Sequence, residues 1–431
     1  MDSNKIDYKT SQYGVLGLLL GIGILMFPIL DQYAGISSHV SLGEAFLILI
    51  IFFFFVMMIK QNIPIKMSHV SKKYIAFLAV ALLVSVFTGL FIDGFSYESM
   101  ILLWGRMLLY AVFVIISGKY SFNHESLIKM YSFICCFLCL YLLYQYIGYY
   151  IFGKIISNYI SFLSIKSSLL DYATRDMGYV YSVSFRPSSL FSEPAKLAQY
   201  LTPCLVLLLF KKDMNQMKHH WIIVGIITAG IVLSTSFLGI IICGIVFFIY
   251  LMSGKVSREK LVFFIAAFIA FTIVFYKTDL ITRNISRVNS GLTTSSGTSS
   301  AALRLLRGWE IFYKLPLFNK LFGVGLYGIA SFLKVTGLTI KYGGSYSYGE
   351  YCSTITYVIN CCGIVGLIPF AGFLSTCFKS SDLSGKVLTV VIVLMGFGSS
   401  FLVTPTWVLY FAIILSCSND EHGKIEKVSE I

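Results

Sequence analysis

The chain has 431 residues, of which 57% are hydrophobic and only 12% are charged, and its formal net charge is +13 at pH 7. A soluble globular protein has about a quarter of its residues charged, so this composition excludes a water-soluble protein of two or three domains. The apolar residues come in blocks of about 15 to 25, close to the length that a helix needs to cross a bilayer. The sequence therefore predicts an all-α, polytopic integral membrane protein.

Apolar blocks in chain order predict about 12 transmembrane helices. They cover residues 13–30, 40–59, 74–92, 98–117, 128–152, 196–210, 221–233, 236–252, 261–276, 351–377, 387–400 and 401–417. The first block lacks a small-x-small cleavage site, so we expect it to be retained as a helix. The seventh and eighth blocks meet at Ser234-Thr235-Ser236. We interpret this polar break as a tight turn between two short spans; a single kinked helix is the alternative.

These helices divide the chain into five parts. The parts are a first group of five helices (1–152), a first long loop (153–195), helices six to nine (196–276), a second long loop with short amphipathic helices (277–350), and helices ten to twelve with a tail (351–431). Short loops rich in Lys and Arg stay in the cytoplasm. The basic short loops of this chain alternate with loops that carry no Lys or Arg. Both termini are therefore expected in the cytoplasm, and both long loops on the opposite face.

The two long loops are basic. Residues 153–196 carry five basic and three acidic side chains, and residues 277–350 carry nine and three. Outward basic loops indicate an anionic partner at that face; solvated loops, or contact with anionic lipid headgroups, are the alternative. Within the second loop, the Ser- and Thr-rich residues 289–300 predict a linker. Residues 301–313 then predict a short helix with Arg304 and Arg307 on one face.

The densest group of polar residues precedes the sixth helix, in Ser184–Lys196. Pro194 suits the first turn of that helix. The planar guanidinium of Arg186 can bind two phosphate oxygens. Glu193 can accept a proton from a sugar hydroxyl, and we expect it to stay ionised beside Arg186. An Arg186–Glu193 ion pair that merely holds the loop is the alternative.

Arg-x-x-Ser-x-Phe-x-Glu-Pro before an apolar helix resembles the O-antigen polymerase and ligase superfamily of membrane glycosyltransferases. Three further segments resemble this family in order: Leu233–Ser236; Arg304-x-x-Arg307-x-Trp309 with Pro316-Leu317 and Gly323-Val-Gly325; and Glu350-Tyr351 with Gly363-Ile-Val-Gly366. Two departures matter. Members often have an arginine where this chain has Phe237, and ligases typically have a histidine in the large outer loop, whereas neither long loop here contains one. The resemblance therefore favours an O-antigen polymerase over a ligase.

The resemblance implies a bacterial inner-membrane enzyme whose donor is a glycan on undecaprenyl pyrophosphate and whose acceptor is a lipid-linked repeat unit. Membrane lipids are further partners, whether a chain-length regulator protein also binds is left open, and no nucleic acid is expected. No nucleotide sugar is expected outside the cytoplasm. Neither long loop has an Asp-x-Asp motif, so we expect a metal-independent reaction without a cofactor.

The predicted site residues follow from these expectations. Arg186, Arg304 and Arg307 are expected to hold the departing pyrophosphate, with Glu193 or Glu350 as the general base. Tyr348 and Tyr351 are candidates for stacking on sugar rings, and interfacial tyrosines are the alternative. Arg106 lies inside the fourth helix, where an arginine at depth costs about 2.5–3.5 kcal/mol. It is predicted either to face a polar cavity, as a further substrate-binding residue, or to reach the outer interface.

A flippase or other transporter of lipid-linked oligosaccharides is a competing hypothesis from another class. Transporters commonly place ionisable groups near the middle of the membrane, often in repeated halves. In this chain only Arg106 and Glu44 are expected within spans, and no internal repeat is evident. The position of the charges in the long loops therefore favours the enzyme.

Overall fold

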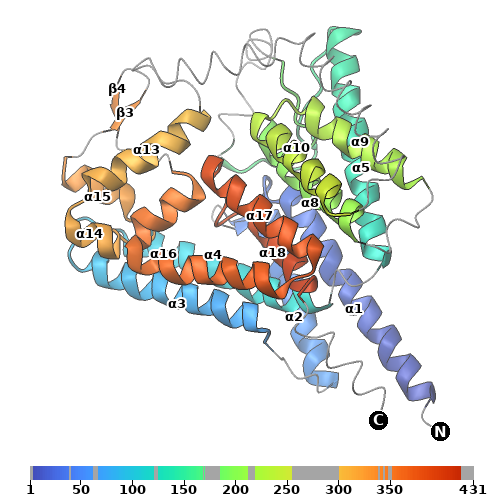
Figure 1. Ribbon diagram of the computed structural model, residues 1–431, viewed down its shortest axis with the longest axis horizontal. Helices are drawn as coiled ribbons and strands as arrows, with labels where there is room; N and C mark the ends of the chain where they lie inside the picture. The colour runs from blue at the N-terminus through green and yellow to red at the C-terminus, as the bar shows by residue number, and fades with distance from the viewer. Residues whose placement is uncertain are drawn as a thin grey trace.

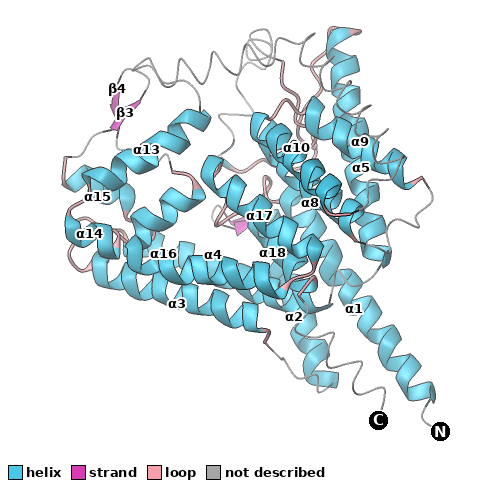
Figure 2. Ribbon diagram, viewed as in Figure 1, coloured by secondary structure: helices cyan, strands magenta, loops and turns pink. Residues whose placement is uncertain are grey.

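A computed structural model of the chain describes residues 3–37, 40–61, 67–120, 125–167, 169, 185–211, 219–254, 300–337, 340–342, 345–347 and 352–418. This part of the chain is helical apart from two short hairpins (Figure 2). One hairpin pairs β1 (Ala34–Ser37) with β2 (Val40–Ser41), and the other pairs β3 (Ile340–Tyr342) with β4 (Ser345–Ser347). The predicted helical character is confirmed, whereas the hairpins were not predicted.

Within the described residues, five helices are long and apolar enough to cross a membrane. They are α2 (Leu42–Gln61), α3 (His69–Gly89), α4 (Tyr97–Tyr120), α5 (Glu125–Tyr150) and α16 (Thr354–Ser380). Large apolar side chains such as Phe52 and Ile59 of α2 are exposed on their outer faces. Such faces are stable against lipid tails, because exposing this much apolar surface to water is unfavourable. The protein is therefore a membrane protein.

The described part of the chain contains six further apolar helices. They are α1 (Ser3–Leu30), α8 (Pro194–Phe210), α9 (His220–Leu233), α10 (Phe237–Met252), α17 (Leu383–Gly398) and α18 (Pro405–Ser416). Eleven of the predicted segments thus contain a helix, and the segment 261–276 lies outside the described residues. With 12 residues, α18 spans only about 18 Å, well short of a hydrocarbon core of about 30 Å. The prediction that 401–417 forms a full span is therefore not confirmed.

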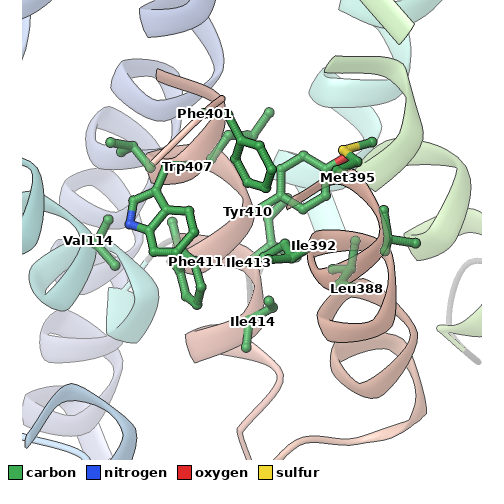
Figure 3. Close-up of a cluster of buried hydrophobic side chains, with 14 of the residues drawn as sticks. Val114, Leu388, Ile392, Met395, Phe401, Trp407, Tyr410, Phe411, Ile413 and Ile414 are labelled. Carbon is green, nitrogen blue, oxygen red and sulfur yellow. The ribbon is translucent and has the colours of Figure 1, made fainter. Parts of the chain in front are cut away.

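The short helix α18 forms the centre of the core instead. It packs against α1, α4, α8 and α17, and Figure 3 shows its side chains between Val114 of α4 and Leu388 of α17. Trp407 is fully buried, and its indole N–H donates a hydrogen bond to the Tyr74 hydroxyl at 2.9 Å. A helix enclosed on all sides is apolar all round, so its hydropathy alone does not distinguish it from a membrane span.

The described loops that connect the helices gather at two ends of the bundle. At one end, the backbone N–H of Asp382 donates to the Cys417 carbonyl at 2.8 Å, and Ser381 pairs with Ser418. At the other end, the β1–β2 hairpin meets both parts of the first long loop. There the Ala34 N–H donates to the Ser164 carbonyl at 2.8 Å, and the Gln32 side chain donates to the Leu190 carbonyl at 2.7 Å. We call this the hairpin end.

Part of the second long loop is built into the bundle. It forms α13 (Ser300–Lys314), α14 (Leu317–Phe322) and α15 (Ile329–Val335), which Figure 1 shows beside α16 and the adjoining end of α3. The N–H groups of Val324 and Gly325 donate to the carbonyls of Asn360 and Cys361 at 2.9 and 2.8 Å. These carbonyls are available because α16 is broken at Gly363, which has φ 63°.

Candidate functional site

Arg186 is bound to the polar break between α9 and α10. Its Nε donates to Thr235 Oγ1 at 3.2 Å, and its Nη2 donates to the Thr235 carbonyl at 3.3 Å. Because α9 ends at Leu233 and α10 begins at Phe237, the predicted turn is confirmed and the kinked helix is excluded. Two segments that carry the family resemblance, 49 residues apart in the chain, therefore meet.

Buried amides hold the loop that carries Arg186. Gln145 of α5 accepts a hydrogen bond from the Ser189 N–H at 2.9 Å and donates to the Ser189 carbonyl at 3.2 Å. The Ser189 hydroxyl also donates to the Leu138 carbonyl at 2.8 Å. Irregular backbone at membrane depth is stable only where other protein groups satisfy it. These bonds therefore fix the loop, and with it the position of the Arg186 side chain.

Glu193 lies at the start of α8 as its N-cap residue, and Pro194 occupies the first turn as predicted. The Glu193 carboxylate makes no capping bond to the helix. Within the described residues it makes no ion pair with Arg186, and the Arg186 guanidinium donates to Thr235. The alternative of an Arg186–Glu193 ion pair is therefore not observed. A half-buried carboxylate at a helix N-terminus remains able to accept a proton or a hydrogen bond.

Arg307 of α13 has a partner that was not predicted from the sequence. Its Nη1 donates to Glu310 Oε2 at 2.8 Å, and its side chain is only 15% exposed. Lys314 donates to the other Glu310 oxygen at 3.1 Å. Partial burial raises the pKa of the Glu310 carboxyl, but the hydrogen bonds and charges of Lys314 and Arg307 outweigh it and lower the pKa below its ordinary value. The i, i+3 spacing of Arg307 and Glu310 was available from the sequence.

Helix α13 packs closely against the first turns of α16. A Cβ atom at Gly308 would lie 2.1 Å from the Thr356 hydroxyl oxygen, so only glycine fits there. The Asn360 amide donates to the Gly308 carbonyl at 2.8 Å. These contacts hold the segment of α13 that contains Arg307 against the broken helix α16. The backbone of Arg304 lies in α13, while its side chain lies outside the described residues.

The first turns of α8, α10 and α16 converge at the hairpin end. Thr354 donates to the Ser399 carbonyl at 2.8 Å, and Gln199 donates to the Ser399 hydroxyl at 3.1 Å. A Cβ at Gly239 of α10 would lie 2.5 Å from that of Ala198. Helix N-termini carry partial positive charge from unpaired N–H groups. We name as the polar layer the residues Arg186, Gln199, Thr235, Arg307, Thr354, Thr356 and Ser399.

Arg106 makes an ion pair with Glu44 at the start of α2. The Arg106 Nε donates to Glu44 Oε1, the Tyr110 hydroxyl donates to the same oxygen at 2.8 Å, and the Ser41 N–H donates to Oε2 at 2.9 Å. Glu44 is 3% exposed, whereas the Arg106 side chain is 35% exposed. A polar cavity and the outer interface were the two predicted environments of Arg106, and an ion pair with Glu44 was not among them. The pair was missed because 62 residues separate its members.

The same hydrogen-bond network reaches the first long loop. Asp31 accepts hydrogen bonds from the Ser41 hydroxyl at 2.8 Å and from Lys166 at 2.9 Å. Lys166, Asp31, Ser41, Glu44 and Arg106 are therefore linked in one series. This network fixes the β1–β2 hairpin against α4 and against the loop that leads toward Arg186.

Glu350, Tyr348 and Tyr351 lie outside the described residues, so their roles stay predictions. Gln145, Glu44 and Glu310 were not predicted from the sequence as partners of the site. The glutamine at position 145 could have been recognised from the sequence, since a polar side chain in an otherwise apolar span needs a hydrogen-bond partner. No family model matches the chain, and no curated protein matches it.

Proposed function

We propose that the protein is a membrane glycosyltransferase that polymerises undecaprenyl-pyrophosphate-linked repeat units into O-antigen or a related surface polysaccharide. The reaction takes place at the hairpin end, which faces the periplasm in this proposal. The observation that carries it is the pair of bonds from Arg186 to Thr235. These bonds join two segments that resemble the same family and hold a guanidinium where three helix N-termini converge.

The proposed reaction breaks the bond between the donor sugar C1 and its pyrophosphate. A hydroxyl of the acceptor repeat unit attacks C1 and forms the new glycosidic bond. Its proton passes to Glu193 or Glu350, and the electron pair of the broken bond leaves on the lipid pyrophosphate. Arg186, Arg304 and Arg307 stabilise the charge that develops on this leaving group, and the nearby helix N-termini contribute in the same direction.

Arg307 has to change partner in this mechanism. It is paired with Glu310 in the described structure, and the pyrophosphate replaces that carboxylate when the substrate binds. Lys314 then remains as the partner of Glu310, because it bonds to the other carboxylate oxygen. Neither carboxylate nor guanidinium is left unpaired by the exchange, which keeps its free-energy cost low.

Deletion of the gene in its host tests the proposal. Loss of a polymerase leaves a lipopolysaccharide core capped with a single repeat unit, whereas loss of a ligase or flippase leaves bare core. Complementation with Arg186→Ala, Arg304→Ala or Glu193→Ala is expected to give no long chains, with membrane levels of the protein unchanged. Lys196→Ala is the matched control, because this exposed cation lies one turn from Glu193 and binds only Ser192 among described residues. Wild-type chain lengths from the first three variants contradict the site.

A flippase is the competing function, and the Glu44–Arg106 pair is the observation in its favour. Ionisable residues within membrane helices often mark transport pathways. A flippase requires this pair for export and does not require Arg186. Bare core after deletion, together with long chains in the Arg186→Ala strain, would select the flippase over the polymerase.

A further inference from the structure

Three tyrosine rings surround Phe185, the residue that precedes Arg186. Phe185 stacks on Tyr149 of α5 with ring centroids 4.0 Å apart and planes 7° apart. The rings of Tyr146 and Tyr150, one turn apart on α5, meet Phe185 edge to face at 5.3 and 5.8 Å. We call Tyr146, Tyr149, Tyr150 and Phe185 the aromatic cluster. Because Phe185 and Arg186 are adjacent, the cluster lies directly beside the guanidinium-bearing segment.

The cluster lies at the C-terminal end of α5. With 26 residues, α5 is about 39 Å long, more than the roughly 30 Å of a hydrocarbon core. Figure 1 shows its C-terminal end extending beyond α9 and α10. The Tyr146 hydroxyl donates to the Leu233 carbonyl at 2.6 Å, which ties the cluster to the turn that binds Arg186. Tyr150 is the last residue of α5 and is 70% exposed.

Aromatic faces and a guanidinium side by side match one chemical class of ligand. A sugar ring presents a flat face of C–H groups that packs on an aromatic ring, and its hydroxyls remain in water at the rim. A phosphate oxygen pair fits the planar fork of arginine. In a lipid-linked glycan the first sugar is bonded directly to the pyrophosphate. A site for this molecule therefore needs an aromatic surface immediately next to a cation.

We propose that the aromatic cluster binds the sugar next to the pyrophosphate of the lipid-linked substrate, with Tyr150 presenting the exposed ring face. This inference rests on the proposed function and adds the part of the substrate that the cluster recognises. A packing role does not account for Tyr150, because most of its surface is exposed. A general interfacial role predicts no difference between Tyr150 and Tyr144, which is also exposed on α5 but contacts Tyr141 rather than Phe185.

Binding to the purified full chain in lipid nanodiscs tests this inference with two probes. The probes are undecaprenyl pyrophosphate, which has no sugar, and the lipid-linked repeat unit extracted from the host. Tyr150→Leu is expected to weaken binding of the repeat unit roughly 3- to 10-fold and to leave undecaprenyl pyrophosphate binding unchanged. Tyr150→Phe keeps the ring and is expected to bind both probes as the wild type does.

Two further variants complete the experiment. Arg186→Gln is expected to weaken both probes, because it removes the cation that holds the pyrophosphate. Tyr144→Leu, the matched control on the same helix, is expected to leave both unchanged. Wild-type protein that binds neither probe overturns the proposed function together with this inference. The sugar site alone is overturned if wild-type protein binds both probes and Tyr150→Leu keeps its affinity for the repeat unit. The same holds if Tyr150→Leu loses affinity for the two probes equally. Equal effects of Tyr144→Leu and Tyr150→Leu also overturn it.

Discussion

The guanidinium of Arg186 is held by two oxygens of one residue, and that residue has an unusual backbone. Thr235 has φ 56°, in the left-handed region that β-branched residues rarely adopt. Its carbonyl and hydroxyl face Arg186 together. A strained residue that positions a charged side chain is typical of functional sites. The hydroxyl therefore contributes to the orientation of Arg186, in addition to its part in the turn.

Thr235→Val tests this contribution at the scale of one hydrogen bond. The substitution keeps the β-branched shape and removes Oγ1 as acceptor, so Arg186 loses one of its two hydrogen bonds to this residue. A bond to a charged group contributes about 1.5 kcal/mol, so polymerisation is expected to slow roughly tenfold, measured as glycan length over time. Thr235→Ser keeps the hydroxyl and should polymerise normally. So should Thr228→Val, whose hydroxyl bonds within α9. Equal rates for Thr235→Val and Thr235→Ser contradict the role.

The Glu310 carboxylate provides a pH-dependent test on α13. Its pKa in the folded protein is lower than its ordinary value of 4.5, so the ionised form stabilises the fold above that value. The stabilisation is lost as the pH falls from 4.5 through the folded-state pKa. Glu310→Gln should therefore unfold at a lower temperature than wild type at pH 7, by an amount that corresponds to about 0.5 kcal/mol for a partly exposed pair.

The difference between Glu310→Gln and wild type should disappear in acid, below the folded-state pKa of Glu310. Thermal unfolding in detergent at several pH values measures it. A difference that stays constant across the whole pH range would show that the amide changes packing rather than charge.

Among the secondary-structure elements, α16 is the one whose interruption creates the site. Gly363 and Gly323 both have positive φ, 63° and 76°, and each lies against the backbone of the other segment. A Cβ at Gly363 would meet the Leu321 carbonyl oxygen at 2.1 Å. The break therefore lets the segment after α14 enter the bundle and pair with Asn360 and Cys361. This pairing places α13, and with it Arg307, over the first turns of α16.

Gly363→Ala is expected to destabilise the protein by about 2 kcal/mol or more, because an L-residue is disfavoured at positive φ and the new methyl has no space. Gly372→Ala provides the control within the same helix. It has ordinary helical geometry and no atom within 4 Å of the new Cβ, so its unfolding temperature should equal or slightly exceed that of wild type. The two unfolding temperatures, measured in detergent, should separate; if they coincide, the break is not required for stability.

On the scale of the whole molecule, the loops lie at two ends and the polar layer lies at only one of them. The hairpin end contains Arg186, Glu193 and the aromatic cluster, whereas Ser381 and Ser418 mark the opposite end. A reaction on a lipid-linked substrate outside the cytoplasm requires the hairpin end to face outward. The orientation of the chain therefore decides whether the proposed chemistry has access to its substrate.

Single cysteines at the two ends test this orientation. All ten native cysteines are free thiols, and nine are buried, so they should react slowly. Ser161→Cys, exposed near the hairpin end, is expected to react with a membrane-impermeant maleimide in spheroplasts. Ser253→Cys, exposed after α10, should react only after permeabilisation. The reverse pattern would place Arg186 in the cytoplasm and contradict the proposed function.

The sequence by itself determined the helical membrane architecture, because a chain with so few charges satisfies its backbone in lipid mainly through helices. It also predicted the turn at residues 234–236, since consecutive polar residues interrupt an apolar run. Periodicity and composition describe local structure, and they do not specify which distant residues meet. Only the tertiary structure paired Arg186 with Thr235, Arg106 with Glu44, and the segment at Gly323 with the break in α16. It also enclosed α18 within the protein, because a buried helix and a lipid-facing helix have the same apolar composition and differ only in what surrounds them.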